Sequence, residues 1–385
     1  MKSDLSTICT YVTDKITVDK LTVDNYISTE NMLPNKCGVV KASSLPQVKQ
    51  VTHYKKGDVL VSNIRPYFKK IWLATNEGGC SNDVLVMRAR KDIETSFLYY
   101  VLSEDDFFEY STVTGKGTKM PRGDKTAIMK YQVPIITHEE QQKIVGLLNK
   151  LDKKININKE INDNLQQQAQ ALFKLWFVEH SPFDSVEPKE WKNVNLEDIT
   201  SLISRGIAPK YSDGSAQMVI NQKCIRNHMI DLSLARAHTP KAINEKWLRF
   251  GDLLINSTGD GTLGRTAQVW FQPQNLTVDS HVTIVRPIKE NLIFYIGLWG
   301  ILHEREIESL HTGSTGQTEL PRERVKALEL LLPDDETLDR FNTLVAPMTD
   351  AIVSNQEESN RLAALRNVLL PKLMSGEIDV TDIQI

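Results

Sequence analysis

The chain has 385 residues, 41% of them hydrophobic and 25% charged, which is typical of a globular protein large enough for two or more domains. It contains no apolar run of eighteen residues, and its first residues, MKSDLSTICT, lack a signal-peptide core, so we expect a cytoplasmic protein without a membrane segment. The net charge is only −3, and the four cysteines are scattered without a C-x-x-C pair, which argues against a disulfide or metal framework.

Residues 1–137 are predicted to form a mixed domain of strands and helix. The runs DVLVSNI (58–64) and DVLVMRA (83–89) have the β-branched content of strands, and SFLYYVLSEDDFFEYS (96–111) predicts a helix. A turn rich in glycine and proline follows, GKGTKMPRGD, and then one short strand. This segment carries 19 Lys and Arg against 15 Asp and Glu, a balance of +4, which permits binding to a polyanion.

A long helix is predicted over residues 138–180. Its heptad positions recur in alternating steps of four and three, which is the signature of a coiled coil. These positions are Ile144, Leu148, Leu151, Ile155, Asn158, Asn162, Leu165, Ala169, Leu172 and Trp176. Residues 181–191, SPFDSVEPKEW, have the proline and acid content of a linker.

Residues 192–333 repeat the first domain. KKGDVLVSNIRP resembles RFGDLLINSTGD at an offset of 194, and SNDVLVMRAR matches DSHVTIVRPI at an offset of 198. The glycine-rich turns match as well, with Pro121-Arg122 opposite Pro321-Arg322 at an offset of 200. Self-similarity at a nearly constant offset indicates that the same α+β domain is present twice.

The second copy closes with a helix predicted over residues 334–385, after the helical window LIFYIGLWGILHEREIES and a short strand. Its heptad positions lie 197 residues after those of the first helix: Phe341, Val345, Met348, Ile352, Asn355, Ser359, Leu362, Arg366, Leu369 and Leu373. The polar interruption recurs, since Asn158 matches Asn355. A buried asparagine costs stability but fixes helix register, so the pair predicts two antiparallel helices that form a coiled coil. Two amphipathic helices on separate cores are the alternative.

The loop INSTGDGTLGRTA raises the question of a nucleotide cofactor. Gly259, Gly261 and Gly264 have the G-x-G-x-x-G spacing of dinucleotide sites, and Asp279 lies twenty residues after the first glycine. Such a site needs a helix after the glycines, because the helix N-terminus supplies donors for the pyrophosphate. The following RTAQVWF predicts a strand instead, and the corresponding loop of the first copy, SNIRPYFKK, has no glycine. We therefore interpret the glycines as serving a turn that needs positive φ.

Motifs of common catalytic centres are absent from the sequence. It has no G-x-x-x-x-G-K-[ST], H-E-x-x-H or G-x-S-x-G, and neither of the methyltransferase signatures N-P-P-[FY] and D-P-P-Y. The eight histidines are dispersed, with no pair at metal-ligand spacing. We interpret the chain as a binding protein whose two domains each contact one short segment of a linear ligand. A self-sufficient DNA-modifying enzyme and a protein-binding coiled-coil scaffold are the alternatives.

A family resemblance adds to this interpretation. VPIITHEEQQKIVGLLNKLDKKI (133–155) is similar to the start of the central helix in specificity subunits of type I restriction–modification enzymes, through Pro134, Glu140-Gln141 and Ile144. NYISTENM, the segments KKGDVLVSNIRP and RFGDLLINSTGDGTLGR, and GSTGQTELPRERV resemble that family's target-recognition domains. LLPKLMSGEIDV resembles the end of the family's second helix, although the second helix of this chain lacks the Glu-Gln pair.

The resemblance implies a DNA-recognition subunit without its own catalytic centre, cofactor or metal. It would bind double-stranded DNA at a bipartite, asymmetric target, with each target-recognition domain reading one half-site and the helices setting the spacer. Two modification subunits would dock on it and carry the S-adenosylmethionine site, and restriction subunits would add cleavage that needs ATP and Mg.

The candidate DNA contacts lie in two pairs of loops, the hairpin tips and the glycine-rich turns. Their amide, hydroxyl and cationic groups are of the kinds that bind base edges and phosphates. The candidates are Asn63, Arg65, Lys69, Lys70, Lys116, Lys119 and Arg122 in the first copy, and Asn256, Ser257, Thr258, Arg265, Gln317 and Arg322 in the second. The alternative for each is a side chain that is merely solvated or has a structural role.

Overall fold

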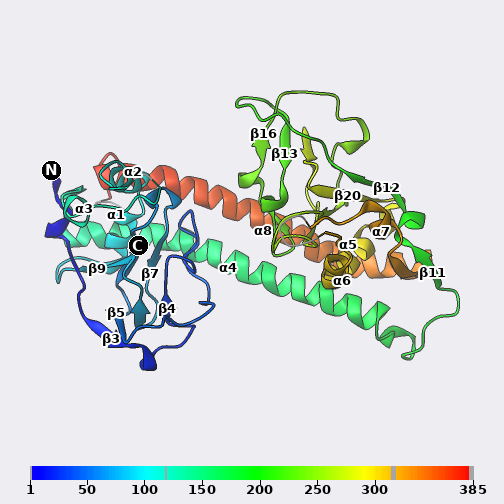
Figure 1. Cartoon of the computed structure of the whole chain (residues 1–385), viewed down its shortest axis with the longest axis horizontal. Coiled ribbons are helices and arrows are strands. Elements are labelled where there is room, and N and C mark those ends of the chain that lie inside the picture. Colours follow the sequence, from blue (N-terminus) through cyan, green and yellow to red (C-terminus); the bar gives the residue numbers. More distant parts are fainter. Residues whose placement is uncertain (1, 118, 314–317, 381–385) are drawn as a thin grey trace. The chain divides into compact units, whose positions relative to one another are not determined.

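The computed structural model describes residues 2–117, 119–313 and 318–380 (Figure 1). Strands and helices are mixed along the chain, which confirms the predicted α+β class. Two helices of 40 and 41 residues, α4 (His138–Phe177) and α8 (Asp335–Ser375), are the longest of the described elements. None of the described helices combines the length and apolar character needed to span a membrane.

The chain divides into two compact units. Unit 1 contains residues 1–156 and 359–385, and unit 2 contains residues 157–358. The boundary falls inside both long helices, α4 and α8. Each unit therefore consists of one mixed domain together with one part of each long helix.

Unit 1 contains two four-stranded sheets. The antiparallel sheet has the strand order β2 (Cys9–Tyr11), β9 (Val84–Ala89), β6 (Val59–Ser62) and β7 (Ile71–Leu73). The second sheet has the order β3 (Lys15–Thr17), β5 (Gln50–Tyr54), β8 (Gly78–Cys80) and β4 (Tyr26–Ile27). In this second sheet β4 runs parallel to β8. The short strands β1 (Lys2–Asp4) and β10 (Gln132–Pro134) pair with each other, and β10 leads into α4.

Two short helices, α1 (Thr95–Leu102) and α2 (Asp105–Val113), occupy the predicted helical window 96–111. The window is interrupted at Ser103, whose hydroxyl donates to the Tyr99 carbonyl (2.7 Å) and thus supports the end of α1. The break lets both helices turn an apolar side to the core of unit 1. The fully buried side chains there include Phe97, Leu98, Phe107 and Phe108 together with Leu5, Val59, Met87 and Leu148.

Unit 2 repeats the antiparallel sheet strand for strand. Its order is β12 (Thr200–Arg205), β20 (Val282–Pro287), β17 (Leu253–Asn256) and β18 (Thr266–Gln268). A three-stranded sheet has the order β16 (Arg236–Ala237), β13 (Met218–Ile220) and β19 (Leu276–Val278), with β13 parallel to β19. Two further antiparallel pairs are β11 (Lys192–Asn195) with β21 (Glu329–Leu332), and β14 (Ile225–Arg226) with β15 (Met229–Ile230).

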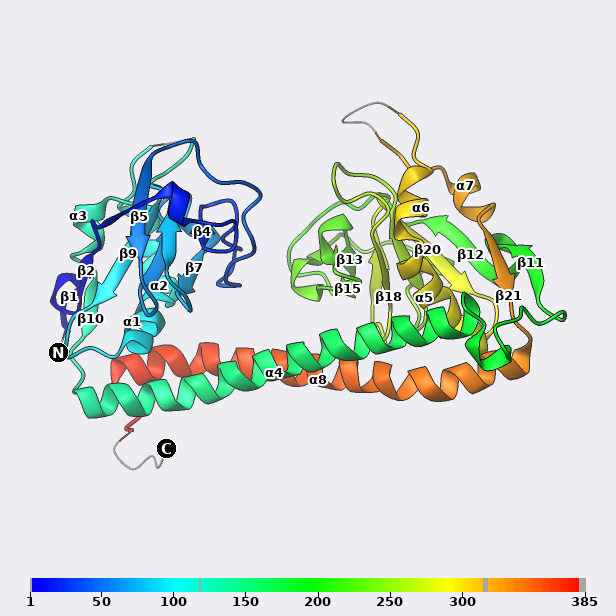
Figure 2. The same ribbon diagram turned by 90° about the horizontal axis from the view of Figure 1, so that it is seen from below.

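The core of unit 2 lies between its antiparallel sheet and the long helices. Figure 2 shows α5 (Ile293–Leu302) in this position, followed by α6 (Glu304–Ser309). Trp299 of α5 packs in one cluster with Leu253 of the sheet and with aromatic residues of α4 and α8, among them Phe173, Trp176, Phe177 and Phe341. This packing explains why α5, the first part of the second helical window, is apolar on almost every side.

One bidentate ion pair recurs at the same place in both antiparallel sheets, each time on a buried aspartate. Arg88 donates to both carboxylate oxygens of Asp58 (2.7 Å each), and Arg286 donates to both oxygens of Asp252 (2.8 Å each). The glycine before each aspartate has a positive φ, near 90°, so the Gly-Asp pair forms the same tight turn twice. The internal repeat predicted from the sequence therefore extends to side-chain contacts.

The two long helices contact each other through a polar layer in unit 2. The Asn158 amide donates to the Asn355 carbonyl (3.3 Å) and to the Glu358 carboxylate (2.7 Å). Asn355 in turn donates to the side-chain oxygen of Asn162 (2.9 Å), and Asn158 is fully buried. The matched asparagines thus lie in contact, and their role in fixing helix register stays a prediction.

The parts of the two helices that belong to unit 1 meet through a different polar group. Arg366 of α8 donates to Asp152 of α4 (2.6 Å), and the second oxygen of the same carboxylate accepts from the Tyr100 hydroxyl (2.7 Å). Tyr100 belongs to α1, so one carboxylate joins both long helices to the domain of unit 1.

Candidate nucleic-acid interface

The two predicted loops of unit 1 lie against each other. Ile64, in the hairpin tip after β6, forms a β-bridge with Arg122, and Arg122 forms another with Lys116. The Arg65 N–H donates to the Pro121 carbonyl (2.8 Å), which ties the tip to the glycine-rich turn. The structure therefore brings together two segments that are some fifty residues apart in sequence.

Unit 2 joins its two loops in the same way, and the contacts correct one sequence match. Thr258 bridges Glu319, and Glu319 bridges Thr312, so Glu319 takes the place that Arg122 has in unit 1. The predicted equivalence of Pro121-Arg122 with Pro321-Arg322 is wrong, because the offset in this turn is 197. Arg322 instead begins the helix α7 (Arg322–Lys326).

The candidates in the hairpin tip of unit 1 are mostly engaged within the domain. Asn63 is buried, with 7% of its surface exposed, and Arg65 has a left-handed backbone (φ 50°). Lys69 forms an ion pair with Asp105 (3.0 Å). The Lys70 ammonium donates to the carbonyl of Thr29 (2.5 Å), and burial lowers the pKa of Lys70. Because of these contacts, fewer side chains of the hairpin tip are available to bind DNA than its sequence suggests.

The glycine-rich turn of unit 1 presents its cations to solvent. Lys116 is exposed and pairs with Asp124 (2.6 Å), the residue that caps α3 (Lys125–Ile128). Because this pair is open to water, the lysine can exchange Asp124 for another anion at little cost. Arg122 pairs with Asp83 (3.1 Å), with more than half of the arginine side chain exposed. Lys119 is exposed as well.

The candidates of unit 2 separate into buried and accessible side chains. Asn256 and Ser257 are fully buried: Asn256 donates to the Gln222 carbonyl (3.0 Å), and the Ser257 hydroxyl lies 2.6 Å from that of Thr283. Both therefore have structural roles and present no surface to DNA. Arg322 is exposed and pairs with its neighbour Glu323, and Arg265, which is partly buried, donates to the Gly261 carbonyl (2.7 Å). Gln317 lies outside the described residues.

The glycines of the G-x-G-x-x-G segment form a turn between two strands. Gly259, Gly261 and Gly264 have φ values of 105°, 66° and 83°, and β18 follows and pairs antiparallel with β17. A Cβ on Gly264 would lie 2.8 Å from the Cα of Glu308, so this position also requires the close approach that only glycine allows. The interpretation of the segment as a turn is confirmed.

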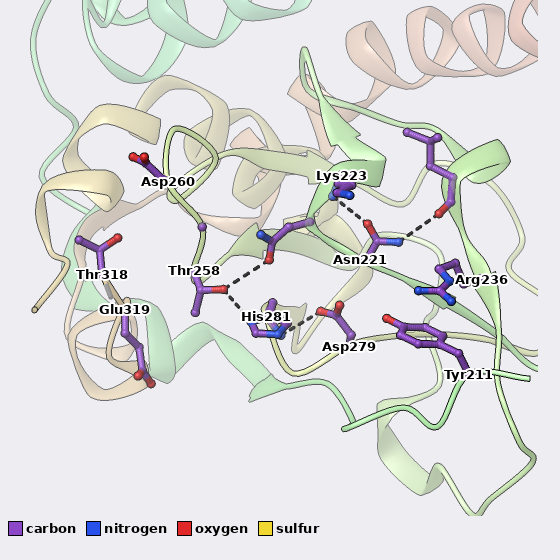
Figure 3. A pocket seen from close by; sticks show the side chains of 13 residues that line it. Tyr211, Asn221, Lys223, Arg236, Thr258, Asp260, Asp279, His281, Thr318 and Glu319 are labelled. Atoms are coloured by element: carbon purple, nitrogen blue, oxygen red, sulfur yellow. Dashed lines mark hydrogen bonds between the residues drawn. The ribbon is translucent and has the colours of Figure 1, made fainter. Parts of the chain in front are cut away.

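A polar cleft of about 770 Å³ lies beside this turn in unit 2, and Figure 3 shows its side chains. Thr258 lies 2.8 Å from His281 and 3.4 Å from the Gln222 carboxamide oxygen. On another side, the guanidinium of Arg236 stacks 3.7 Å from the centre of the Tyr211 ring. The lining comprises Tyr211, Asn221, Gln222, Lys223, Leu234, Arg236, Thr258, Gly259, Asp260, Asp279, His281, Thr318 and Glu319.

Unit 1 has a cleft of about 420 Å³ at the equivalent place, where the parallel strands β4 and β8 end. In unit 1 the Ser81 N–H donates to the Ile27 carbonyl, and in unit 2 the Asp279 N–H donates to the Ile220 carbonyl, both at 2.9 Å. The lining of the cleft in unit 1 comprises Tyr26, Ser28, Thr29, Glu30, Asn31, Val40, Lys41, Ala42, Ser43, Ser44, Leu45, Pro46, Ser81 and Asp83. The two clefts share a backbone arrangement and differ in side chains.

Sequence reasoning missed most of the residues of both clefts. Among the predicted contacts that the structure describes, only Thr258 lines one of the two clefts. Asn221 and Gln222 follow β13, as Ser28 and Thr29 follow β4. The polar run after each of these short strands is the sequence feature that could have indicated the clefts.

Known proteins resemble this chain in sequence and in fold. A family model described as the type I restriction modification DNA specificity domain matches residues 8–167. The MjaIX specificity subunit of Methanocaldococcus jannaschii is 26% identical over 360 residues, which cover 86% of this chain and 79% of that protein. The HindI specificity subunit of Haemophilus influenzae is 23% identical over 434 aligned positions, covering 92% of this chain and 94% of the relative.

A solved structure supports the same relationship at the level of the fold. The crystal structure of the S subunit of a type I restriction–modification system from M. genitalium has a TM-score of 0.53 and 13% identity to this chain, and the likeness covers 97% of this chain and 96% of that one. By sequence, this chain is thus similar to specificity subunits of type I restriction–modification enzymes.

Proposed function

We propose that this chain is the DNA-recognition subunit of a type I restriction–modification complex and binds a duplex target with two unlike half-sites. The observation that carries the proposal is the repeated cleft, which has one backbone arrangement and two different linings. Base sequence is read through contacts to base edges, whereas phosphate contacts position the protein. Two equivalent clefts with different side chains can therefore bind two different short base sequences, one in each half-site.

Cations beside each cleft suit the phosphate backbone. Arg122 pairs with Asp83, a residue of the unit 1 cleft, and Arg322 follows the turn that carries Glu319 of the unit 2 cleft. Because Lys116 and Arg122 already have acidic neighbours, DNA must compete with these carboxylates for them. We expect affinity to fall as salt rises, by about 0.9 in log K per decade of salt for each phosphate neutralised.

The long helices are proposed to set the spacer between the half-sites and to dock two modification subunits. S-adenosylmethionine, ATP and Mg would be bound by the modification and restriction subunits, and this chain would perform no chemical step. The names of the relatives, which are specificity subunits, support a recognition role within such a complex.

An exchange of domains tests the proposal. Residues 1–137 are replaced by the corresponding domain of another specificity subunit, and the full-length chimera selects duplexes from a randomised library. We expect one half-site of the enriched motif to change while the other half-site and the spacer are retained. A change in both half-sites would refute independent reading, and enrichment of no motif by the parent chain would refute DNA recognition itself.

A further inference from the structure

A nearly buried carboxylate at the cleft of unit 2 has no role in the shared backbone arrangement. Asp279 follows β19 and has only 3% of its surface exposed. Its Oδ1 accepts from the His281 N–H (2.9 Å), and no hydrogen bond within the described residues uses Oδ2. Figure 3 shows the Asp279 side chain beside His281, in the same cleft as Tyr211 and Arg236.

The turn that contains Asp279 forms equally well without a carboxylate. Ser81 occupies the same place in unit 1, where its carbonyl accepts from the Val84 N–H (3.0 Å), as the Asp279 carbonyl accepts from Val282 (3.2 Å). Within the described part of unit 1, no hydrogen bond joins the Ser81 hydroxyl to Asp83. The carboxylate of unit 2 is therefore not required by the fold of the turn.

The surroundings of Asp279 compensate its charge only in part. No Lys, Arg or His side chain of the described residues forms an ion pair with it, although Lys223 and Arg236 line other parts of the cleft. Burial raises the pKa of Asp279, and the backbone N–H and the imidazole of His281 oppose this only in part. A desolvated carboxylate that faces a polar cleft is stabilised by a donor that enters the cleft.

We propose that Asp279 is a specificity-determining residue, which accepts a hydrogen bond from the exocyclic amino group of a cytosine or adenine in one half-site. This inference rests on the proposed DNA recognition. In the major groove only cytosine N4 and adenine N6 present such donors. Guanine and thymine present O6, N7 and O4 acceptors, which a carboxylate repels. Ser81 can both donate and accept, so the equivalent position of the other half-site lacks this restriction.

Two reciprocal substitutions test the assignment in the full-length chain. Asp279→Asn keeps the size of the side chain and the acceptor for His281 but adds a donor. Ser81→Asp gives the cleft of unit 1 the carboxylate of unit 2. Asp350→Asn, on the exposed side of α8, is the matched control for the change of charge.

Each variant selects duplexes from a randomised library, and the base frequencies at every position of the motif are compared. For Asp279→Asn we expect the preference for cytosine or adenine over guanine or thymine to drop about 5- to 100-fold at one position of one half-site. Ser81→Asp is expected to create such a preference in the other half-site, and Asp350→Asn to change neither.

Unchanged base frequencies in an Asp279→Asn chain that unfolds at the wild-type temperature would overturn the assignment and leave DNA recognition intact. An altered preference in both half-sites would overturn it as well. If Asp279→Asn does not fold, Ser81→Asp decides alone, because Ser81 is only half-buried and absence of a new preference there would overturn the assignment. If the wild-type chain enriches no motif, the proposed function of DNA recognition, on which this assignment rests, would be overturned.

Discussion

Unit 1 and unit 2 share their antiparallel sheet strand for strand, but they differ in the second sheet, which contains the parallel strand pair and lies beside the cleft. In unit 1 the antiparallel strand β5 pairs with β8, whereas in unit 2 the antiparallel strand β16 pairs with the opposite member of the parallel pair, β13. The sheet that packs on the long helices is thus kept, and the part that shapes the cleft varies. Variation is tolerated there because the cleft is held by backbone hydrogen bonds, which do not depend on side-chain identity.

The largest effect is expected for the ion pairs of the shared sheet, which differ in burial. The Arg286 side chain is 7% exposed and also donates to the carbonyls of Glu245 and Trp247, whereas the Arg88 side chain is 35% exposed. We expect Arg286→Met to lower the free energy of unfolding by about 3–5 kcal/mol, because it strands the buried charge of Asp252. Arg88→Met should cost about 1–3 kcal/mol, since water can reach Asp58 once the arginine is gone.

Urea unfolding of the full chain measures the loss of unfolding free energy in each variant. Hydrogen exchange of the backbone amides in each sheet, measured along the urea series, assigns the loss to unit 1 or unit 2. Each loss should be confined to the unit that carries the substitution. Equal losses in the two units would mean that exposure of the arginine does not control the strength of the pair.

A second comparison concerns the short helices α2 and α6. The residue before α2 is Glu104, a half-buried acid, whereas the residue before α6 is His303, whose ring nitrogen lies 2.8 Å from the Trp299 carbonyl. Burial, with a smaller contribution from Asp106, raises the pKa of Glu104 to about 7. The folded chain therefore holds this proton more tightly than the unfolded chain does, and stability falls as pH rises from the ordinary value near 4.5 through about 7.

Glu104→Gln removes this pH dependence. At pH 8 we expect the variant to be more stable than the wild type by roughly 1–3 kcal/mol, and the difference should vanish near pH 4, where both unfolded and folded Glu104 are protonated. Calorimetry of the full chain across this pH range measures it, with Glu109→Gln, an exposed position of the same helix, as control. A difference that is independent of pH would show that packing, not titration, distinguishes the variants.

The sequence predicted the parts of the molecule that depend on local patterns. The two long helices follow from a heptad spacing, and the duplicated sheet follows from repeated Gly-Asp turns and β-branched runs. The clefts could not be predicted in this way, because Gln222 and Asp279 are 57 residues apart and meet only through the parallel pairing of β13 and β19. Parallel pairing is non-local and has no short sequence signal.

Two errors at the candidate site have similar causes. Asn256 and Ser257 stand in a polar stretch that suggests an exposed loop, but β17 extends to Asn256 and the Gln222 carbonyl accepts its amide hydrogen. The Pro-Arg match failed because it followed identical residue types, whereas the β-bridges place Glu319, three residues before Arg322, at the position of Arg122. Both errors arise at strand ends and turns, where tertiary contacts rather than periodicity decide burial.

The smallest effect is a change in DNA affinity, and it is expected at an ion pair of unit 1 that has no counterpart in unit 2. Arg122 pairs with Asp83, whereas the equivalent of Asp83 is His281, which contacts the Thr258 hydroxyl. The Asp83 and Arg122 side chains are 39% and 58% exposed, so the pair itself contributes at most about 1 kcal/mol. Asp83→Asn frees the guanidinium for a phosphate, and we expect DNA affinity to rise about 2- to 5-fold, with a salt dependence steeper by up to about 0.9 in log K per decade.

Asp92→Asn provides the matched control for this last prediction, because it removes the same charge from an exposed position of unit 1 without releasing an arginine. Thr258→Val supplies the counterpart in unit 2, where loss of the contact with His281 frees no cation and should leave the salt dependence unchanged. Binding measured over a range of salt concentrations separates the possibilities. If Asp83→Asn weakens binding at an unchanged salt dependence, Asp83 contacts a base rather than restraining Arg122, and the cleft of unit 1 reads its half-site through a carboxylate, as we infer for unit 2.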